Sequence, residues 1–120
     1  MKNNPRAVVA YIVGCLSTNR NCSSIYDYSS RKYINISGTV ELSQVSVFDY
    51  EQHCYITGSG NKGSFSLFHY GDKHYINLNF KNGSFDGYDY GSRCHFSGSV
   101  SGCSISLYDY DERKYYSYSI

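Results

Sequence analysis

The stretch Ile25-Tyr26-Asp27-Tyr28 decides the fold of this chain, because four related tetrapeptides follow it at almost constant spacing. Their starts are separated by 22, 20, 20 and 20 residues. A fixed period near 20 residues is typical of repeat proteins, in which each unit buries its apolar side against its neighbours. The later copies are Val47-Phe48-Asp49-Tyr50, Leu67-Phe68-His69-Tyr70, Gly87-Tyr88-Asp89-Tyr90 and Leu107-Tyr108-Asp109-Tyr110.

The 120 residues are predicted to form a single repeat domain, with units that start near residues 23, 45, 65, 85 and 105 and a partial repeat at 7–22. Each complete unit contains two segments in which apolar and polar residues alternate. Short stretches rich in Gly, Asn, Asp and Ser separate these segments. The pattern predicts strand-turn-strand-turn units and an all-β fold.

The alternation divides each strand into two faces. One face carries Tyr and small polar residues, and the other carries aliphatic residues and Phe. The second face is predicted to form the core, and its residues are Ile34, Ile36, Val45, Val47, Ile56, Phe65, Leu67, Ile76, Leu78, Phe85, Phe96, Ile105 and Leu107.

Two topologies fit this pattern. In a β-solenoid or β-roll, each unit is one coil, and equivalent residues of parallel strands stack about 4.8 Å apart. In an antiparallel β-meander, each unit is a hairpin, and the sheet closes into a barrel or sandwich. The Asn82-Gly83 pair is a strong hairpin signal and favours the meander. The uniformly aromatic repeat positions favour the solenoid, where each ring would stack on its equivalent, and this is the topology that we predict.

The N-terminal apolar run has two interpretations. Tyr11–Leu16 aligns with Tyr55–Gly60 and His95–Val100, which predicts a strand in the partial repeat. Alternatively, Ile12-Val13-Gly14-Cys15 resembles a bacterial lipoprotein cleavage box, which would make the protein an exported lipoprotein anchored at Cys15. The similarity to the downstream repeats favours the strand.

Composition narrows the possible partners and location. The formal net charge is +1, and Lys and Arg are scattered, so no nucleic-acid partner is expected. No stretch reaches the roughly 18–20 apolar residues of a membrane-spanning helix, so no transmembrane segment is predicted. The five Cys residues are odd in number and form no CxxC pair, which favours free thiols in a reducing, cytoplasmic environment over export.

The sequence gives little indication of catalysis. Four Asp residues at one repeat position are typical of turns closed by side-chain hydrogen bonds to backbone N–H groups, and not of a differentiated acid and base. No GxSxG nucleophile elbow is present. We therefore expect no enzymatic activity and no cofactor.

Cys54, His74 and Cys94 occupy the same repeat position and are weak candidates for a metal site. On successive coils of a solenoid they would form a column within reach of one zinc or copper ion. Because Lys32 and Lys114 occupy this position in other units, a tolerant turn position is the better interpretation, and no metal is predicted.

The Tyr-rich outer face is the candidate binding surface, since Tyr offers a large amphipathic contact area at low entropic cost. We expect a structural or adhesive module that associates with itself, because the terminal strand, residues 115–120, lacks a polar cap. The alternative is a module that binds carbohydrate or peptide through this Tyr/Ser face. The candidate residues are Tyr28, Tyr33, Tyr50, Tyr55, Tyr70, Tyr75, Tyr90, Tyr110 and Tyr115.

Overall fold

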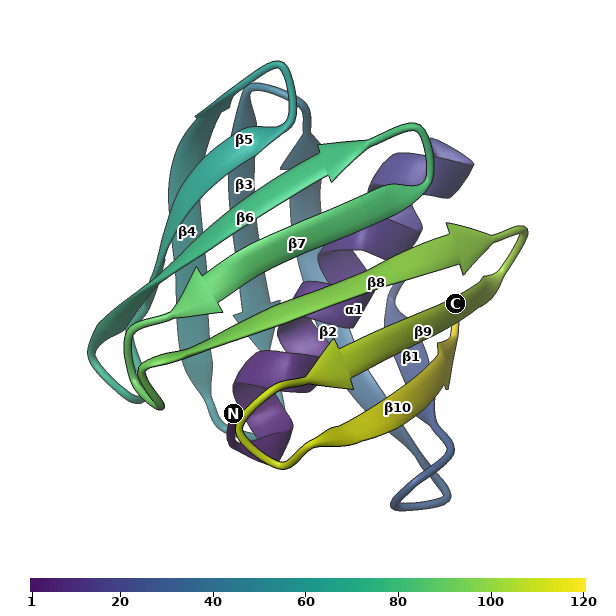
Figure 1. Cartoon of the computed structure of the whole chain (residues 1–120). Coiled ribbons are helices and arrows are strands. Elements are labelled where there is room, and N and C mark those ends of the chain that lie inside the picture. The colour runs from purple at the N-terminus through teal and green to yellow at the C-terminus, as the bar shows by residue number, and fades with distance from the viewer.

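The repeated tetrapeptides lie at the ends of five of the ten strands in the computed structural model, which describes residues 1–120. One helix precedes the strands, and each strand runs antiparallel to the one before it (Figure 1). The elements are α1 (Asn3–Thr18), β1 (Ser24–Asp27), β2 (Lys32–Glu41), β3 (Gln44–Asp49), β4 (Cys54–Asn61), β5 (Ser64–His69), β6 (His74–Lys81), β7 (Ser84–Asp89), β8 (Cys94–Ser101), β9 (Ser104–Asp109) and β10 (Lys114–Ser119).

The ten strands form one closed antiparallel barrel. Strands that are adjacent in the chain pair with each other, and β1 pairs with β10 to close the barrel. In this closing pair Tyr26 lies opposite Ser119, and Asp27 lies opposite Tyr118. Because every strand has a partner on both sides, the sheet has no free edge.

The strand pairing corrects the predicted topology. Leu67 lies opposite Gly58 on one side and Ile76 on the other, in antiparallel pairs. Parallel coils would have placed it beside Val47 and Gly87. The fold is therefore the alternative β-meander, closed into a barrel, and not the favoured β-solenoid.

Two classes of turn alternate around the barrel and explain this topology. At the short-turn end, strands are joined by two residues, as in Asn82-Gly83, where φ is 51° and 79°. Positive φ at both positions is the geometry of a tight hairpin, so the predicted hairpin turn is confirmed. At the long-turn end, four residues follow each tetrapeptide Asp or His69, and the last of them has a left-handed φ: Arg31, His53, Lys73, Arg93 or Arg113.

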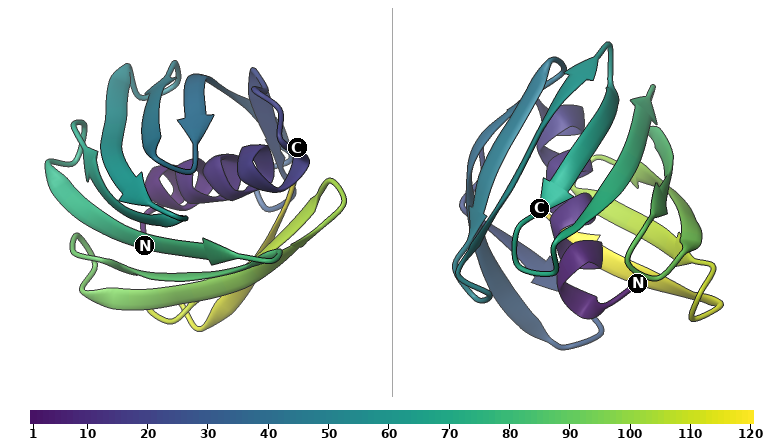
Figure 2. Two further views of the ribbon diagram at one scale, coloured as in Figure 1. Left: turned by 90° about the horizontal axis from the view of Figure 1, so that it is seen from above. Right: turned by 90° about the vertical axis from the view of Figure 1, so that its left-hand side faces the viewer.

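Helix α1 lies inside the barrel, with strands on all sides (Figures 1 and 2). The consecutive residues Ala7–Val13 are each 0% exposed. An eight-stranded barrel is just filled by its own side chains, so a wider ten-stranded barrel needs further filling. The 16 residues of α1 span about 24 Å and provide it within a molecule of 30 × 29 × 28 Å. The helix does not combine the length and apolarity needed to cross a membrane.

The helix corrects the predicted strand at Tyr11–Leu16 and the partial repeat at 7–22. A helix buried on all sides lacks the one-sided apolar stripe that reveals most helices, and its β-branched residues favour a strand by propensity. Pro5 lies in the first turn, where proline is tolerated. The helix ends at Asn19, whose φ of 53° is a left-handed C-cap. The segment Ile12–Cys15, which resembles a lipoprotein cleavage box, lies within this helix.

The predicted core face points into the barrel and packs around the helix. Its thirteen predicted residues are all at most 5% exposed. Glycines make room for large rings on this face: a Cβ at Gly87 would lie 2.4 Å from the Phe96 ring, and one at Gly98 would lie 2.5 Å from the Phe85 ring. The two faces of the strands are therefore confirmed.

Candidate functional site

The nine predicted tyrosines all lie on the outer surface near the long-turn end of the barrel. Their side chains range from 51% exposed at Tyr90 to 70% exposed at Tyr33. Only one other large hydrophobic residue is more than half exposed, Leu42, and it lies in a turn at the opposite end. The exposed aromatic surface is thus concentrated in one region.

Each repeat unit builds one aromatic triad in this region. A half-buried central ring contacts two more exposed rings, edge to face, with centroids 4.7–5.0 Å apart and interplanar angles of 64–80°. Because the units follow one another around the closed sheet, we call the five triads the aromatic belt. Its members are Tyr26 with Tyr28 and Tyr33, Phe48 with Tyr50 and Tyr55, Phe68 with Tyr70 and Tyr75, Tyr88 with Tyr90 and His95, and Tyr108 with Tyr110 and Tyr115.

The triads explain why three positions of every unit are aromatic. The solenoid interpretation required each ring to stack on its equivalent in the next unit. Instead, the rings pack within one hairpin, as Phe48 does with Tyr50 from the turn and Tyr55 from the next strand. Edge-to-face pairs contribute about 0.5–1.5 kcal/mol each beyond their buried area, which favours the observed positions of the rings.

Polar groups lie beside the rings. The Tyr50 hydroxyl is 3.3 Å from the hydroxyl of Ser37, and the Tyr90 hydroxyl accepts a 3.3 Å hydrogen bond from the side-chain amide of Asn77. The Tyr110 and Ser97 hydroxyls are 3.4 Å apart. The belt therefore combines aromatic faces with hydrogen-bonding groups along the same surface.

A second cluster, the polar ring, lies inside the barrel at the long-turn end. It consists of the repeated Asp27, Asp49, His69, Asp89 and Asp109, each at most 3% exposed. The four carboxylates accept hydrogen bonds of 2.8–3.1 Å from backbone N–H groups two residues further along. His69 substitutes for the carboxylate, because its Nδ1 accepts a 3.0 Å bond from the N–H of Asp72. The predicted turn-closing role is confirmed.

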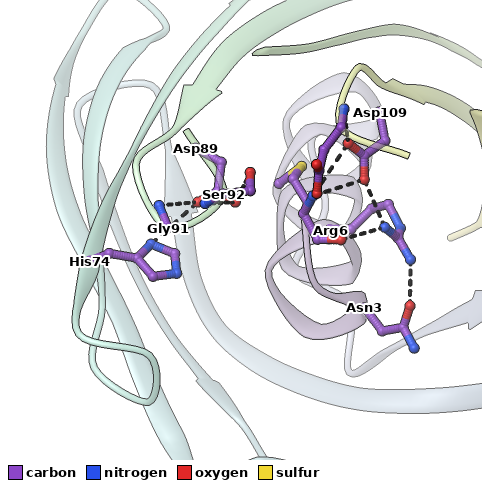
Figure 3. Close-up of polar contacts among 9 residues, drawn as sticks. Asn3, Arg6, His74, Asp89, Gly91, Ser92 and Asp109 are labelled. Atoms are coloured by element: carbon purple, nitrogen blue, oxygen red, sulfur yellow. Dashed lines mark hydrogen bonds and ion pairs between the residues drawn. The ribbon is translucent and has the colours of Figure 1, made fainter. Parts of the chain in front are cut away.

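The polar ring contacts the N-terminal end of α1, where the helix dipole favours negative charge, and Figure 3 shows one of these contacts, between Arg6 and Asp109. The Arg6 guanidinium donates to Asp109 at 2.9 Å, and the pair is 2% and 0% exposed. The Met1 amino group lies 3.1 Å from both Asp109 and Asp111. Burial lowers the pKa of this amino group, but the hydrogen bonds and charges of the two Asp residues outweigh burial and raise it.

Asn4 joins the helix to two further members of the polar ring. Its side-chain N–H donates to Asp49, and its carbonyl oxygen contacts Nε2 of His69. Since Nδ1 of His69 accepts the bond from Asp72, Nε2 carries the proton and donates to Asn4. Burial lowers the pKa of His69 from its ordinary value of 6.5, and nearby His74 lowers it further, against the opposing charges of Asp72 and Asp49.

The polar ring is structural in its chemistry. Its acceptors are used by turn N–H groups and by the helix, and α1 fills the space in front of them. Burial also raises the pKa of two interior thiols, that of Cys15 to about 11 and that of Cys54 in the same direction. Both groups are protonated at neutral pH and are weak nucleophiles.

The structure does not bring the weak metal candidates together. Cys54, His74 and Cys94 begin β4, β6 and β8, so an intervening strand separates each from the next. His74 instead contacts two carboxylates, Asp72 at 3.5 Å and Asp89 at 3.3 Å, the second of which is labelled in Figure 3. No group of three or more His, Cys, Asp or Glu side chains has a geometry suited to a metal ion. The predicted column of Cys54, His74 and Cys94 required parallel coils, and the antiparallel barrel therefore does not form it.

The polar ring and its helix partners were not predicted from the sequence, although one signal pointed to them. In the first strand of the second unit, Val45, Val47 and Asp49 are spaced two residues apart. Their side chains therefore point to the same face of the strand, so the Asp points to the core. A buried carboxylate at that position requires a buried donor or cation. The candidates were the Asn and Arg residues at the start of the chain.

Comparison with protein-family models, curated proteins and solved structures finds no match to this chain.

Proposed function

We propose that this protein is a non-enzymatic module that binds carbohydrate through the aromatic belt. The observation that carries the proposal is that nine tyrosines, each more than half exposed, are held in edge-to-face contacts on the outside of a closed and filled barrel. Rings fixed in this way lose little conformational freedom on binding, so they favour recognition.

The interior offers little support for another kind of site. Helix α1 occupies the lumen, and the side chains of the polar ring already have hydrogen-bond partners. A ligand or substrate would have to displace the helix to reach them. The outer surface is therefore the favoured place for recognition.

Closure of the barrel favours a glycan over an extended peptide. Peptides that add to a sheet need an exposed strand edge, and β10, which was expected to offer one, is paired with β1. A pyranose needs no edge, because its C–H groups pack on the negative face of an aromatic ring while its hydroxyls bond to polar neighbours. The belt offers both kinds of contact, with Ser37 and Ser97 beside Tyr50 and Tyr110.

The adhesive role is retained in this proposal, since binding of surface glycans is one means of adhesion. What changes is the mechanism, from strand addition to contact through side chains. Self-association is a second candidate, favoured by the concentration of exposed rings at one end of the molecule. Sedimentation that shows a monomer over a wide concentration range would argue against it.

The test is calorimetric titration with maltotriose, lactose and mannotriose of five variants, each with one tyrosine of a different triad replaced by Ala: Tyr28, Tyr50, Tyr70, Tyr90 or Tyr110. At least one replacement is expected to weaken binding about two- to tenfold, since stacking contacts of this kind contribute on the order of 0.5–1.5 kcal/mol. Leu42→Ala is the matched control, because Leu42 is similarly exposed, at 54%, but lies outside the belt. Absence of binding to all three sugars, or equal binding by all variants, contradicts the proposal.

A further inference from the structure

The repeats differ from one another most clearly at three polar positions on the outer face of β6 and β7. Asn77, Asn79 and Asp86 occupy these positions. The first unit has Asn35 at the position equivalent to Asn77, and the other equivalent positions have only Ser or Thr, at residues 37, 39, 46, 57, 59, 66, 97, 99, 106, 117 and 119. The neighbouring β8 also carries the only belt member that is not Tyr or Phe, His95.

These exceptions lie side by side. Asn79 is directly opposite Asp86, and Asp86 is opposite Ser97 on the next strand. The Asn79 side-chain amide donates a 3.1 Å hydrogen bond to Oδ1 of Asp86. One row further toward the belt, Asn77 is opposite Tyr88, and Tyr88 is opposite His95.

A shallow open groove of about 830 Å³ covers this patch. Asn77, Asn79 and Asp86 line it together with the rings of Tyr88, His95 and Tyr110. Arg93 is the only cationic side chain of its lining and offsets the charge of Asp86. The groove therefore combines a carboxylate, two amides and three aromatic rings with no excess of charge.

We propose that this groove, which we call the β6–β8 groove, is the saccharide subsite of the molecule, and the inference rests on the carbohydrate-binding function proposed above. Its ligand is a neutral pyranose with two adjacent hydroxyls. Asp86 can accept hydrogen bonds from both hydroxyls, because a carboxylate has about four lone-pair sites and only one is used by Asn79. Asn79 provides a further acceptor, and the aromatic rings face the C–H groups of the sugar.

The chemistry selects a neutral sugar over an acidic one. Arg93 balances the charge of Asp86 in the groove lining, so the groove provides no net attraction for an anionic sugar. Hydrogen bonds from sugar hydroxyls to an ionised carboxylate are stronger than bonds between neutral groups. Asp86 is therefore the residue on which affinity depends most.

The test converts the groove into the pattern of the other units. The double variant Asn79→Ser/Asp86→Ser has the Ser residues that the fold already accepts at the equivalent positions 59, 99, 46, 66 and 106, so it is expected to fold normally. Affinity for the best-bound of maltotriose, lactose and mannotriose should fall about 10- to 100-fold. The matched control Ser46→Ala changes the position equivalent to Asp86 in another unit, opposite Thr39 and Thr57 and away from the groove, and should leave affinity unchanged.

Nuclear magnetic resonance provides a second readout that does not depend on a variant. In the wild-type protein, the same sugar should shift the side-chain amide signals of Asn77 and Asn79, and leave those of Asn35 and Asn61 unmoved. Binding that is lost in the Tyr50 or Tyr70 variants but kept in the Asn79/Asp86 double variant overturns the β6–β8 groove and leaves the belt proposal intact. Binding to none of the sugars contradicts both.

Discussion

Asp109 differs from the other repeated aspartates because a buried guanidinium lies against it. Arg6 donates to its Oδ2 at 2.9 Å, and both side chains are almost wholly removed from solvent. Asp27 occupies the same repeat position, but its hydrogen bonds are with Ser29 in its own turn. Asp109 therefore both closes its turn and pairs with Arg6 of the helix, whereas Asp27 closes its turn.

Replacing Asp109 with Asn is expected to lower the free energy of unfolding by about 3–5 kcal/mol, because it leaves the buried charge of Arg6 without its partner. Asp27→Asn should cost about 1 kcal/mol or less, since an amide oxygen can still accept the turn bond from Ser29. Urea unfolding of both variants measures the difference. Equal losses would show that Asp109 serves only its turn.

His69 makes stability depend on pH in a predictable direction. Burial holds its pKa below 6.5 in the folded state, with His74 acting in the same sense and Asp72 and Asp49 opposing; the neutral Asn4 faces it from the helix. Below about pH 6.5 the unfolded chain binds the proton first, so the free energy of unfolding falls until the pH reaches the lowered folded-state pKa. Above pH 6.5 His69 is neutral in both the folded and the unfolded state, so it adds no pH dependence to the free energy of unfolding.

The variant His69→Asn can still accept the turn bond but cannot titrate. The difference in free energy of unfolding between this variant and the wild-type protein should change between pH 7 and pH 5, with the wild-type protein losing more. Comparing the two proteins cancels the contributions of His53 and His95, whereas His74, whose ring is 5.8 Å from that of His69, belongs to the same coupled pair. Parallel pH profiles would contradict the role assigned to His69.

At the scale of elements, the strands were predictable and the helix was not. The strands are half-buried, so the sequence alternates and reveals which residues face the core. Helix α1 is surrounded by strands, so Ala7–Val13 are apolar without any periodicity. Its β-branched residues then point to a strand, and only the packing of the whole barrel reverses that preference.

Truncating Ile12 to Ala should lower the free energy of unfolding by about 2–5 kcal/mol, as expected for a fully buried aliphatic side chain. Leu42→Ala, in an exposed turn, should change it by less than about 0.5 kcal/mol. Equilibrium unfolding in guanidinium chloride compares the two. A small effect at Ile12 would mean that the helix does not pack inside the barrel.

The short turns provide a comparison between two glycines with positive φ. Gly63 has a φ of 91°, and a Cβ there would lie 2.4 Å from the carbonyl oxygen of Phe80. Gly102 has a φ of 59°, and a Cβ there would meet nothing within 4 Å. Gly102→Ala should cost about 1–2 kcal/mol for the left-handed conformation alone, and Gly63→Ala should cost clearly more.

Thermal unfolding of both Gly→Ala variants gives the order directly. If the two variants lose the same free energy of unfolding, the backbone of Phe80 does not approach Gly63 closely enough to exclude a Cβ.

At the scale of the whole molecule, the sequence contained the correct topology signal together with a misleading one. Asn82-Gly83 indicated a hairpin, and the structure has one there. The uniform aromatic positions indicated stacking between units, whereas the rings pack within each unit. Closure of the sheet depends on contacts between β1 and β10, about 90 residues apart, and no local pattern reports such a contact.

The same reasoning applies to the candidate surface. The nine tyrosines could be identified from the sequence alone, because the alternation of residues along each strand places them on the outer face. The β6–β8 groove could not be named, because its importance depends on Asn79, Asp86 and His95 lying on adjacent strands. In the predicted solenoid, Asn79 would have lain on a different coil from Asp86 and His95.

The measurement that tests the central claim most directly is a nuclear Overhauser spectrum of the protein in solution. A barrel closed around its helix predicts contacts between β1 and β10, at Tyr26 with Ser119 and at Asp27 with Tyr118, together with contacts from Gly14 of α1 to Ile105. Contacts between equivalent residues of successive units, such as Leu67 with Gly87, in the absence of any between β1 and β10, would contradict the closed barrel and restore the stacked coils.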